Sequence, residues 1–190
     1  METMVYEIRR ANETDLPQIK KLQESSYYSK VSDFDKVKEG FVSVESDISL
    51  LRTINKDIGI LIAEVHNKLV GYEMPLGYEH AIQIPLLDPF VKRFTELDYE
   101  GQKIREYQWV IEGQINIEKE YKRKGIAEVL HKNFVNILQG KYDLIITEIS
   151  DQNPRSLNVH TKKLGLSVVD EYQAEGRNWY VLLQDIRTDK

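Results

Sequence analysis

The sequence of 190 residues contains no cysteine, which excludes disulfide bonds, thiolate metal ligands and a cysteine nucleophile. It has no apolar run near the roughly 20 residues that a membrane-spanning helix requires, and its N-terminal segment has no apolar core of the kind found in a signal peptide. Basic residues are also few: 26 Lys and Arg stand against 31 Asp and Glu, and the net charge of −5 disfavours nucleic-acid binding. We therefore expect a cytoplasmic protein that binds neither membranes nor nucleic acid.

The length suits a single domain, 1–190, and the apolar patterns predict a mixed α/β arrangement. Strands are expected at 5–9, 58–64, 69–76, 106–117, 142–149, 167–172 and 179–186. Helices are expected after Thr14 or Asp15, at 48–54, at 125–139 and after Asn153, with shorter helical segments within 29–46 and 90–97. This order of elements predicts a central sheet with helices on its faces.

Strict alternation along the strand 106–117 predicts two distinct faces. One face is expected to carry Ile111, Gly113, Ile115 and Ile117, and the other Val110, Glu112, Gln114 and Asn116.

A basic turn joins this strand to the helix at 125–139. Lys122, Arg123 and Lys124 precede Gly125, and Ala127 is a second small residue. The first turn of a helix presents unpaired backbone N–H groups and a partial positive charge, and glycine lets an anion approach the backbone closely. The turn is thus a candidate site for a pyrophosphate, with a solvated basic cap on a helix as the alternative interpretation.

A second motif follows the apolar strand 142–149. Asn153 and Pro154 are typical of a helix N-cap and first helical position, and the helix carries Ser156 and His160 before it ends in KLGL at 163–166. In order and spacing, these residues and the basic turn resemble the GNAT superfamily of acetyl-CoA-dependent N-acetyltransferases. The segment 115–117 resembles the end of that superfamily's fourth strand, 122–127 its pyrophosphate turn and 153–166 its last helix, whereas 77–105 matches only loosely.

The resemblance implies a GNAT-like α/β fold, with a mixed, partly splayed sheet of six to seven strands and about four flanking helices. It implies acetyl-CoA as co-substrate, and transfer of the acetyl group to a primary amine of a small molecule or peptide by direct attack in a ternary complex. The alternatives are a catalytically inactive acyl-CoA-binding module that acts as a sensor or scaffold, a transferase for longer acyl groups, and an unrelated α/β binding protein. A homodimer is also expected from the habit of the superfamily. The residues that the resemblance places at the cofactor are Ile115, Asn116, Ile117, Lys122, Arg123, Lys124, Gly125, Ile126, Ala127, Asn153 and Ser156.

The resemblance also indicates two candidate catalytic residues, His160 and Glu112. His160 faces inward on its helix and is the candidate proton donor to the departing thiolate, with a packing histidine as the alternative. The last helix is one residue longer than usual, so Thr161 competes for the same position. Glu112 is the candidate base, because a carboxylate on the fourth strand is frequent in the superfamily. Glu148 is a weaker candidate, and a mechanism without a strong base is the alternative.

Two further expectations concern the acceptor and metals. Candidates to line an acceptor pocket are Tyr27, Tyr28, Phe34, Tyr72, Tyr78 and Tyr99, with ordinary core or surface positions as the alternative. His66, His80 and His131 are scattered along the sequence without metal-ligand spacing, so no metal site is expected.

Overall fold

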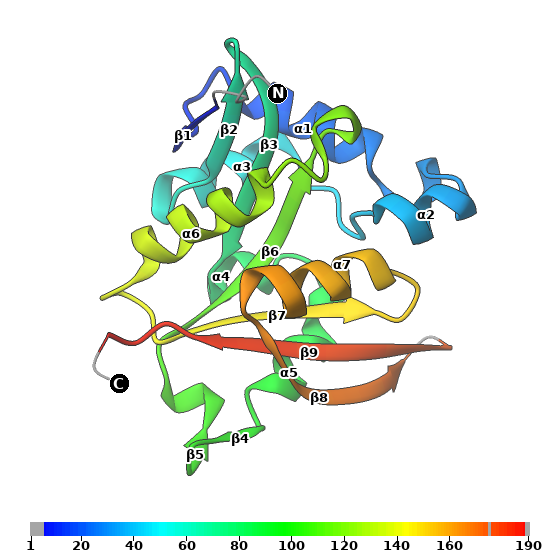
Figure 1. Ribbon diagram of the computed structural model, residues 1–190. Helices are drawn as coiled ribbons and strands as arrows, with labels where there is room; N and C mark the ends of the chain where they lie inside the picture. The colour runs from blue at the N-terminus through cyan, green and yellow to red at the C-terminus, as the bar shows by residue number, and fades with distance from the viewer. Residues whose placement is uncertain (1–5, 175, 189–190) are drawn as a thin grey trace.

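Seven strands form one mixed sheet in the order β1-β2-β3-β6-β7-β9-β8 (Figure 1). The computed structural model describes residues 6–174 and 176–188. The strands are β1 (Glu7–Arg10), β2 (Leu61–Val65), β3 (Lys68–Leu76), β6 (Trp109–Ile117), β7 (Leu144–Ser150), β8 (Ser167–Ala174) and β9 (Arg177–Asp185). All neighbours are antiparallel except β6 and β7, which are parallel. The expected strand at 5–9 corresponds to β1, and its first residue, Val5, lies outside the described residues.

Helices cover both faces of this sheet (Figure 1). The helices are α1 (Leu16–Ser25), α2 (Asp33–Glu39), α3 (Ile48–Asp57), α4 (Tyr78–Ala81), α5 (Asp88–Phe94), α6 (Ile126–Leu138) and α7 (Pro154–Val159). The described residues thus hold more helices than the roughly four expected. α2 and α5 correspond to the shorter helical segments expected within 29–46 and 90–97, whereas α4 was not predicted because a helix of four residues gives no periodic signal. A small separate hairpin pairs β4 (Asp98–Tyr99) with β5 (Gln102–Lys103). No helix in the described segments is long and apolar enough to cross a membrane.

Two hydrophobic cores hold these layers together. On one face, Leu16 and Ile19 of α1 and Leu51 of α3 pack with Tyr72 and neighbouring side chains of β3. On the opposite face, α6 buries one apolar stripe against β2, β3 and β6. The stripe follows the four-residue spacing of a helix face, and its members are Ile126, Leu130, Phe134 and Leu138. Since α6 is anchored along its whole length, its first turn is held in a fixed place beside β6.

The sheet opens between its two parallel strands. β6 and β7 pair only through Trp109 with Leu144, Val110 with Ile145 and Ile111 with Ile146. Beyond this point β6 continues beside β3, β7 continues beside β9, and the two strands diverge in Figure 1. The partly splayed sheet expected from the sequence is therefore present, and the opening exposes one edge of the last residues of β6.

A β-bulge at Gly113 lies at the start of this opening. The pairing with β3 passes from Met74–Gln114 directly to Pro75–Glu112, so Gly113 is the extra residue on β6. One inserted residue reverses which face the following side chains occupy. Glu112 therefore points to the α6 side of the sheet, while Gln114 points to the α1 side and accepts a hydrogen bond from Gln23.

The two predicted faces of the strand 106–117 are consequently wrong. Ile111 packs in the α1 core and Ile117 in the α6 core, although alternation placed them together. Glu112 is likewise separated from Asn116, whose side chain reaches the Leu22 carbonyl of α1. Simple alternation failed because it assumes that no residue is inserted between the two halves of the strand.

We expect Gly113→Ala to destabilise the fold. A Cβ at this position would lie 2.7 Å from Leu76 Cγ and 3.1 Å from the Met74 carbonyl oxygen, and both of these residues are buried. Forcing a methyl group into such a site costs about 1–3 kcal/mol, which denaturant unfolding followed by circular dichroism measures directly. Gly77→Ala is the matched control, because its Cβ would make only ordinary contacts of 3.4 Å or more. Equal stability of the two variants would contradict the packing described here.

Candidate active site

A cavity of about 350 Å³ lies where β6 and β7 part. It is bounded by the end of β6, the basic turn, the first turn of α6, α7 and the residues that follow α2. Most of the residues expected at the cofactor line it, namely Ile115, Asn116, Ile117, Lys122, Arg123, Gly125, Ile126, Ala127 and Ser156. The structure thus brings together two sequence motifs that lie on different elements.

Two of the expected residues lie elsewhere. The Lys124 ammonium group lies 5.1 Å from the centre of the Tyr121 ring and does not line the cavity. The Asn153 side chain accepts a hydrogen bond from Ser156 N and donates one to the Phe41 carbonyl, so it caps α7 and fastens a neighbouring loop. A turn directs successive side chains to different sides, and a capping side chain is engaged by its own helix, while Asn153 also lines the second cavity described below. A cofactor role for these two residues stays a prediction.

The first turn of α6 is built to face an anion. Gly125 adopts a left-handed conformation, with φ of 79°, and a Cβ at this position would meet nothing within 4 Å. The chain therefore enters the 13-residue helix with open space beside its first N–H groups, which carry the positive end of the helix dipole. Lys122 and Arg123 from the turn, with Arg155 and Lys163 from the last helix, add positive charge to the same cavity.

An acidic residue already occupies part of this positive surface. Lys122 Nζ donates to the Glu39 carbonyl at 2.7 Å, and Arg123 contacts the Glu39 carboxylate at 3.1 Å. Burial lowers the pKa of Lys122 below its usual range, and the nearby Arg155 lowers it further against the opposing effect of Glu39. An anion that binds at the turn therefore competes with Glu39. Sequence reasoning missed Glu39 because it lies more than 80 residues from the turn and belongs to no motif.

A second cavity, of about 100 Å³, lies beside the first and shares His160 and Ser156 with it. Its aromatic walls are Phe41, Phe90 and Trp179. None of the six aromatic residues expected in an acceptor pocket lines either described cavity. Tyr72, for example, is fully buried and donates its hydroxyl to Gln114. Composition alone does not reveal which aromatic side chains a splayed sheet leaves at its opening.

His160 stands at the junction of the two cavities because α7 ends in a wide turn. After Val159 the chain forms a π-helical turn, His160–Leu164, which Gly165 terminates with φ of 85°. A π turn accommodates one more residue than an α turn, and this absorbs the extra residue noted in the sequence. His160 is 5% exposed and lines both cavities, whereas Thr161 donates its hydroxyl to the Leu157 carbonyl and lines neither.

The two expected catalytic residues contact each other. His160 Nδ1 lies 2.7 Å from the Ser156 carbonyl, which can only accept, so Nδ1 carries a proton. His160 Nε2 lies 3.1 Å from Glu112 Oε1. Burial alone would raise the pKa of Glu112, but His160 outweighs it and holds that pKa below its usual value. Burial likewise lowers the pKa of His160, and Glu112 outweighs it in the opposite direction. The geometry thus favours an imidazolium–carboxylate pair.

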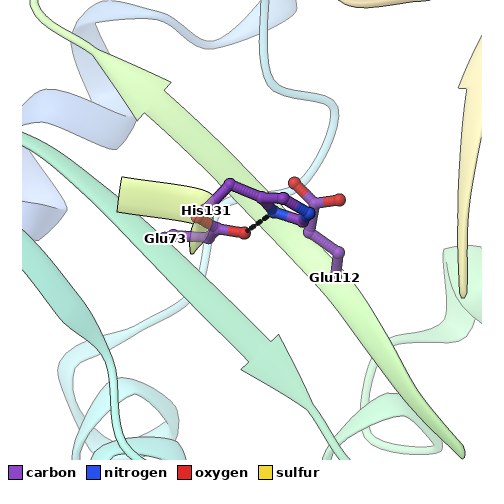
Figure 2. A group of neighbouring side chains, drawn as sticks. All are labelled: Glu73, Glu112 and His131. Atoms are coloured by element: carbon purple, nitrogen blue, oxygen red, sulfur yellow. Dashed lines mark hydrogen bonds and ion pairs between the residues drawn. The ribbon is translucent and has the colours of Figure 1, made fainter. Parts of the chain in front are cut away.

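A second buried pair adjoins the first. His131 on α6 lies with Nδ1 2.6 Å from Glu73 Oε1 on β3 (Figure 2). Its Nε2 lies 2.8 Å from the side-chain oxygen of Gln184. Burial raises the pKa of Glu73 to about 7. Burial lowers the pKa of His131, but the Glu73 carboxylate outweighs this effect and raises it to about 9. Sequence reasoning treated His131 as scattered, because its partner is 58 residues away.

These side chains also form a candidate metal-ligand group that the sequence did not predict. Ligand atoms of Glu73, Glu112 and His131 all lie within 4.8 Å of one another. In Figure 2 the His131 ring lies between the two carboxylates. With His160 as the fourth member, two carboxylates face two imidazoles, and the group can balance its charge without an ion.

Comparison with known proteins identifies the fold but finds no relative by sequence. No protein-family model matches the chain, and no curated protein matches it. Among solved structures, a GNAT-family acetyltransferase from Streptococcus pneumoniae is 14% identical and has a TM-score of 0.63 over 95% of this chain and 99% of that one. A putative acetyltransferase from Salmonella typhimurium, solved with its cofactor acetyl-CoA, is 13% identical, with a TM-score of 0.62 over 96% and 94%. The ribosomal-protein-S18-alanine N-acetyltransferase from Escherichia coli is 10% identical, with a TM-score of 0.62 over 98% and 97%. The chain therefore has the GNAT fold, as its motifs predicted.

The buried pairs predict how stability depends on pH. The folded state raises the pKa of His131 from its ordinary value of 6.5 to about 9. The folded state also raises the pKa of Glu73 from 4.5 to about 7. Groups whose pKa is raised on folding stabilise most at low pH, so the Glu73 contribution is lost as the pH rises through 7 and the His131 contribution as it rises through 9. Urea unfolding at a series of pH values should show this decline in the wild-type protein. His131→Asn should be less stable at neutral pH, because it leaves the Glu73 carboxylate buried without its cation, and it should lack the part of the decline between pH 7 and 9. A pH-independent free energy of unfolding in the wild type would contradict the pairing.

Proposed function

We propose that this protein transfers an acetyl group from acetyl-CoA to a primary amine by direct attack of the amine in a ternary complex. The observation that carries the proposal is the contact between Glu112 and His160 at the junction of two cavities. One cavity begins at a helix terminus suited to phosphates, and the other offers apolar walls to an acceptor. The GNAT fold adds support, because the similar structures include acetyltransferases.

The residues of the larger cavity fit acetyl-CoA as a substrate. The first turn of α6, with Lys122 and Arg123, would bind the pyrophosphate once Glu39 yields its contacts. The edge of β6 beyond Ile111 is left free by the divergence from β7, so its backbone groups would pair with the amide groups of the pantetheine arm. Such pairing leads the thioester toward His160, which lines the same cavity.

Glu112 is the proposed general base. A primary ammonium group has a pKa of about 10.4, so the amine must lose a proton to become a nucleophile. Glu112 Oε1 accepts from His160, and its buried Oε2 has no hydrogen-bond partner among the described residues. Oε2 therefore has lone pairs free to accept the amine proton. Glu148 is less suited, because it accepts a hydrogen bond from the Tyr172 hydroxyl.

His160 is the proposed general acid. The departing thiolate of coenzyme A benefits from a proton donor, since a thiol has a pKa of about 8.5. Protonation of Glu112 by the amine removes the negative charge that holds the His160 proton. The imidazolium then becomes more acidic and can release its Nε2 proton to the thiolate. An ammonium group loses two protons on becoming an amide: one is released to solvent as the free amine forms, and Glu112 takes the second as the new N–C bond forms. His160 protonates the sulfur as the C–S bond breaks, and transfer of the proton from Glu112 back to His160 then restores both groups.

The acceptor is proposed to be a small molecule or a peptide that bears a primary amine. The smaller cavity has both apolar and polar walls, and the carboxylates of Glu112 and Glu148 among the polar ones favour a cationic amine. Peptide amines belong to this class, because similar structures include the S18-alanine N-acetyltransferase and a NatC complex bound to a Gag peptide and CoA.

Acetyl-CoA should raise the midpoint of thermal unfolding, and Lys122→Ala should reduce the shift. A ligand that binds only the folded state stabilises it by about 2.7 kcal/mol at 100 times its Kd. Lys124→Ala is the matched control, because it removes an equal charge from the same turn but outside the cavity. We expect the control to keep the wild-type shift. No shift at millimolar acetyl-CoA would refute binding at this cavity.

Release of CoA in the presence of an amine panel should depend on Glu112. Glu112→Gln keeps the size of the side chain and its contact with His160 but removes the base, and we expect kcat to fall about 10²- to 10⁴-fold. Binding of acetyl-CoA should be unchanged, which calorimetry checks. Thr161→Ala is the control and should retain near wild-type turnover, because the hydroxyl contacts only its own helix. Tight binding of acetyl-CoA without turnover of any amine would instead support the acyl-CoA-binding module.

A further inference from the structure

The Glu73–His131 pair has no part in the proposed proton transfers, yet it is placed where apolar side chains would pack more easily. Glu73 is fully buried and His131 is 3% exposed, between β3 and α6. Burying a carboxylate and an imidazole carries a desolvation penalty that a hydrophobic pair would avoid. The pair also lies against Glu112, with ligand atoms of all three residues within 4.8 Å. Its location suggests a function connected with Glu112.

The hydrogen bonds of the second pair repeat those of the first. His131 Nε2 faces the side-chain oxygen of Gln184, so this nitrogen carries a proton, and Nδ1 faces Glu73. In the same way His160 donates from Nδ1 to a carbonyl oxygen and faces Glu112 with Nε2. Each imidazole is thus fixed by one neutral acceptor and shares its second nitrogen with a carboxylate.

Charge then couples the two pairs. Glu112 has His160 on one side, from the turn that follows α7, and His131 on another, from α6. The attraction of both imidazoles favours the ionised form of Glu112. Glu73, from β3, supplies the negative charge that lets a buried His131 keep its proton. Glu73 and Glu112 also repel each other, but the His131 ring lies between the two carboxylates, so the cation is the nearer charge to Glu112 (Figure 2). Without Glu73, His131 would lose its proton more readily, and Glu112 would lose a near cation together with a more distant anion.

We propose that Glu73 and His131 are positioning residues for Glu112, holding a second positive charge beside its carboxylate and so keeping it ionised to accept the amine proton. This inference rests on the proposed function, in which Glu112 is the base. Residues of β3 and α6 would thus control the ionisation of the proposed base on β6.

The proposal predicts opposite changes at the two histidines in Glu73→Gln. His131 should release its proton at lower pH, because its carboxylate partner is gone. His160 should release its proton at higher pH, because a neighbouring positive charge has been lost. The chain contains four histidines, so the imidazole signals can be assigned with single His→Asn variants and followed by NMR titration.

Asp57→Asn is the matched control for this titration. Asp57 is the carboxylate partner of another buried histidine, His80, at 3.1 Å, and it lies outside both cavities. The control should leave the titration of His160 unchanged. A His160 midpoint that is also unchanged in Glu73→Gln would overturn the proposal, because it would show that the second pair acts on packing alone.

Activity gives the second readout. In Glu73→Gln the acid limb of the profile of kcat/KM against pH should move to higher pH by about one unit, which is a roughly tenfold loss of rate on that limb. His131→Asn removes the same cation and should move the limb in the same direction, so the test survives if one variant fails to fold. A uniform loss of rate with an unmoved limb in the folded variants would overturn the proposal.

The two readouts separate this inference from the proposed function. If the wild type binds acetyl-CoA but acetylates no amine, the proposed function fails, and the NMR titration still shows whether the pairs are coupled. If turnover is normal and neither limb nor His160 moves, the positioning role fails alone. Metal analysis of the purified protein is the remaining check. A stoichiometric divalent ion whose removal by a chelator shifts the His131 signals would overturn the proposal in favour of a metal site at Glu73, Glu112 and His131.

Discussion

The divergence of two parallel strands is the constraint on which the remaining features depend. β6 and β7 share three residue pairs and then separate, and the bulge at Gly113 lies at the point of separation. The separation leaves one edge of β6 without a neighbouring strand and opens a cavity beside it. The bulge also turns Glu112 toward α6. Without both features, the basic turn and the last helix would flank a closed sheet, and Glu112 could not meet His160.

Buried charge is the second organising feature. Glu73, Glu112, His131 and His160 come from two strands, one helix and one π turn, and none is more than 5% exposed. Each charge is tolerable only because an opposite charge lies within hydrogen-bonding distance. The four side chains therefore depend on one another, since removal of one of them leaves another charge buried without a compensating partner. The protonation of Glu112 and His160 at the cavity junction is therefore coupled to the packing of α6, which carries His131.

The positive charge at the first turn of α6 is partly neutralised by acidic residues of the same chain. Glu39, the last residue of α2, places its carbonyl on Lys122 and its carboxylate on Arg123, and Asp35 on the same helix pairs with Lys119. The acidic segment thus covers cationic groups that an isolated turn would expose to solvent. A phosphate group bound at this place would have to displace the contacts that Glu39 makes with Lys122 and Arg123.

Much of this arrangement follows from the sequence alone. Apolar periodicity predicted the sheet and α6, because it depends on residues close together in the chain. The GNAT fold was predicted from the resemblance carried by the basic turn before Gly125 and the Asn-Pro start of the last helix. The faces of β6, the partners of His131 and the contact of Glu39 with the turn were decided only by the tertiary structure. Each depends on a single inserted residue or on contacts across 58 or more positions, and no local pattern records either. The choice of His160 over Thr161 has the same origin, since only the packed π turn determines which side chain points inward.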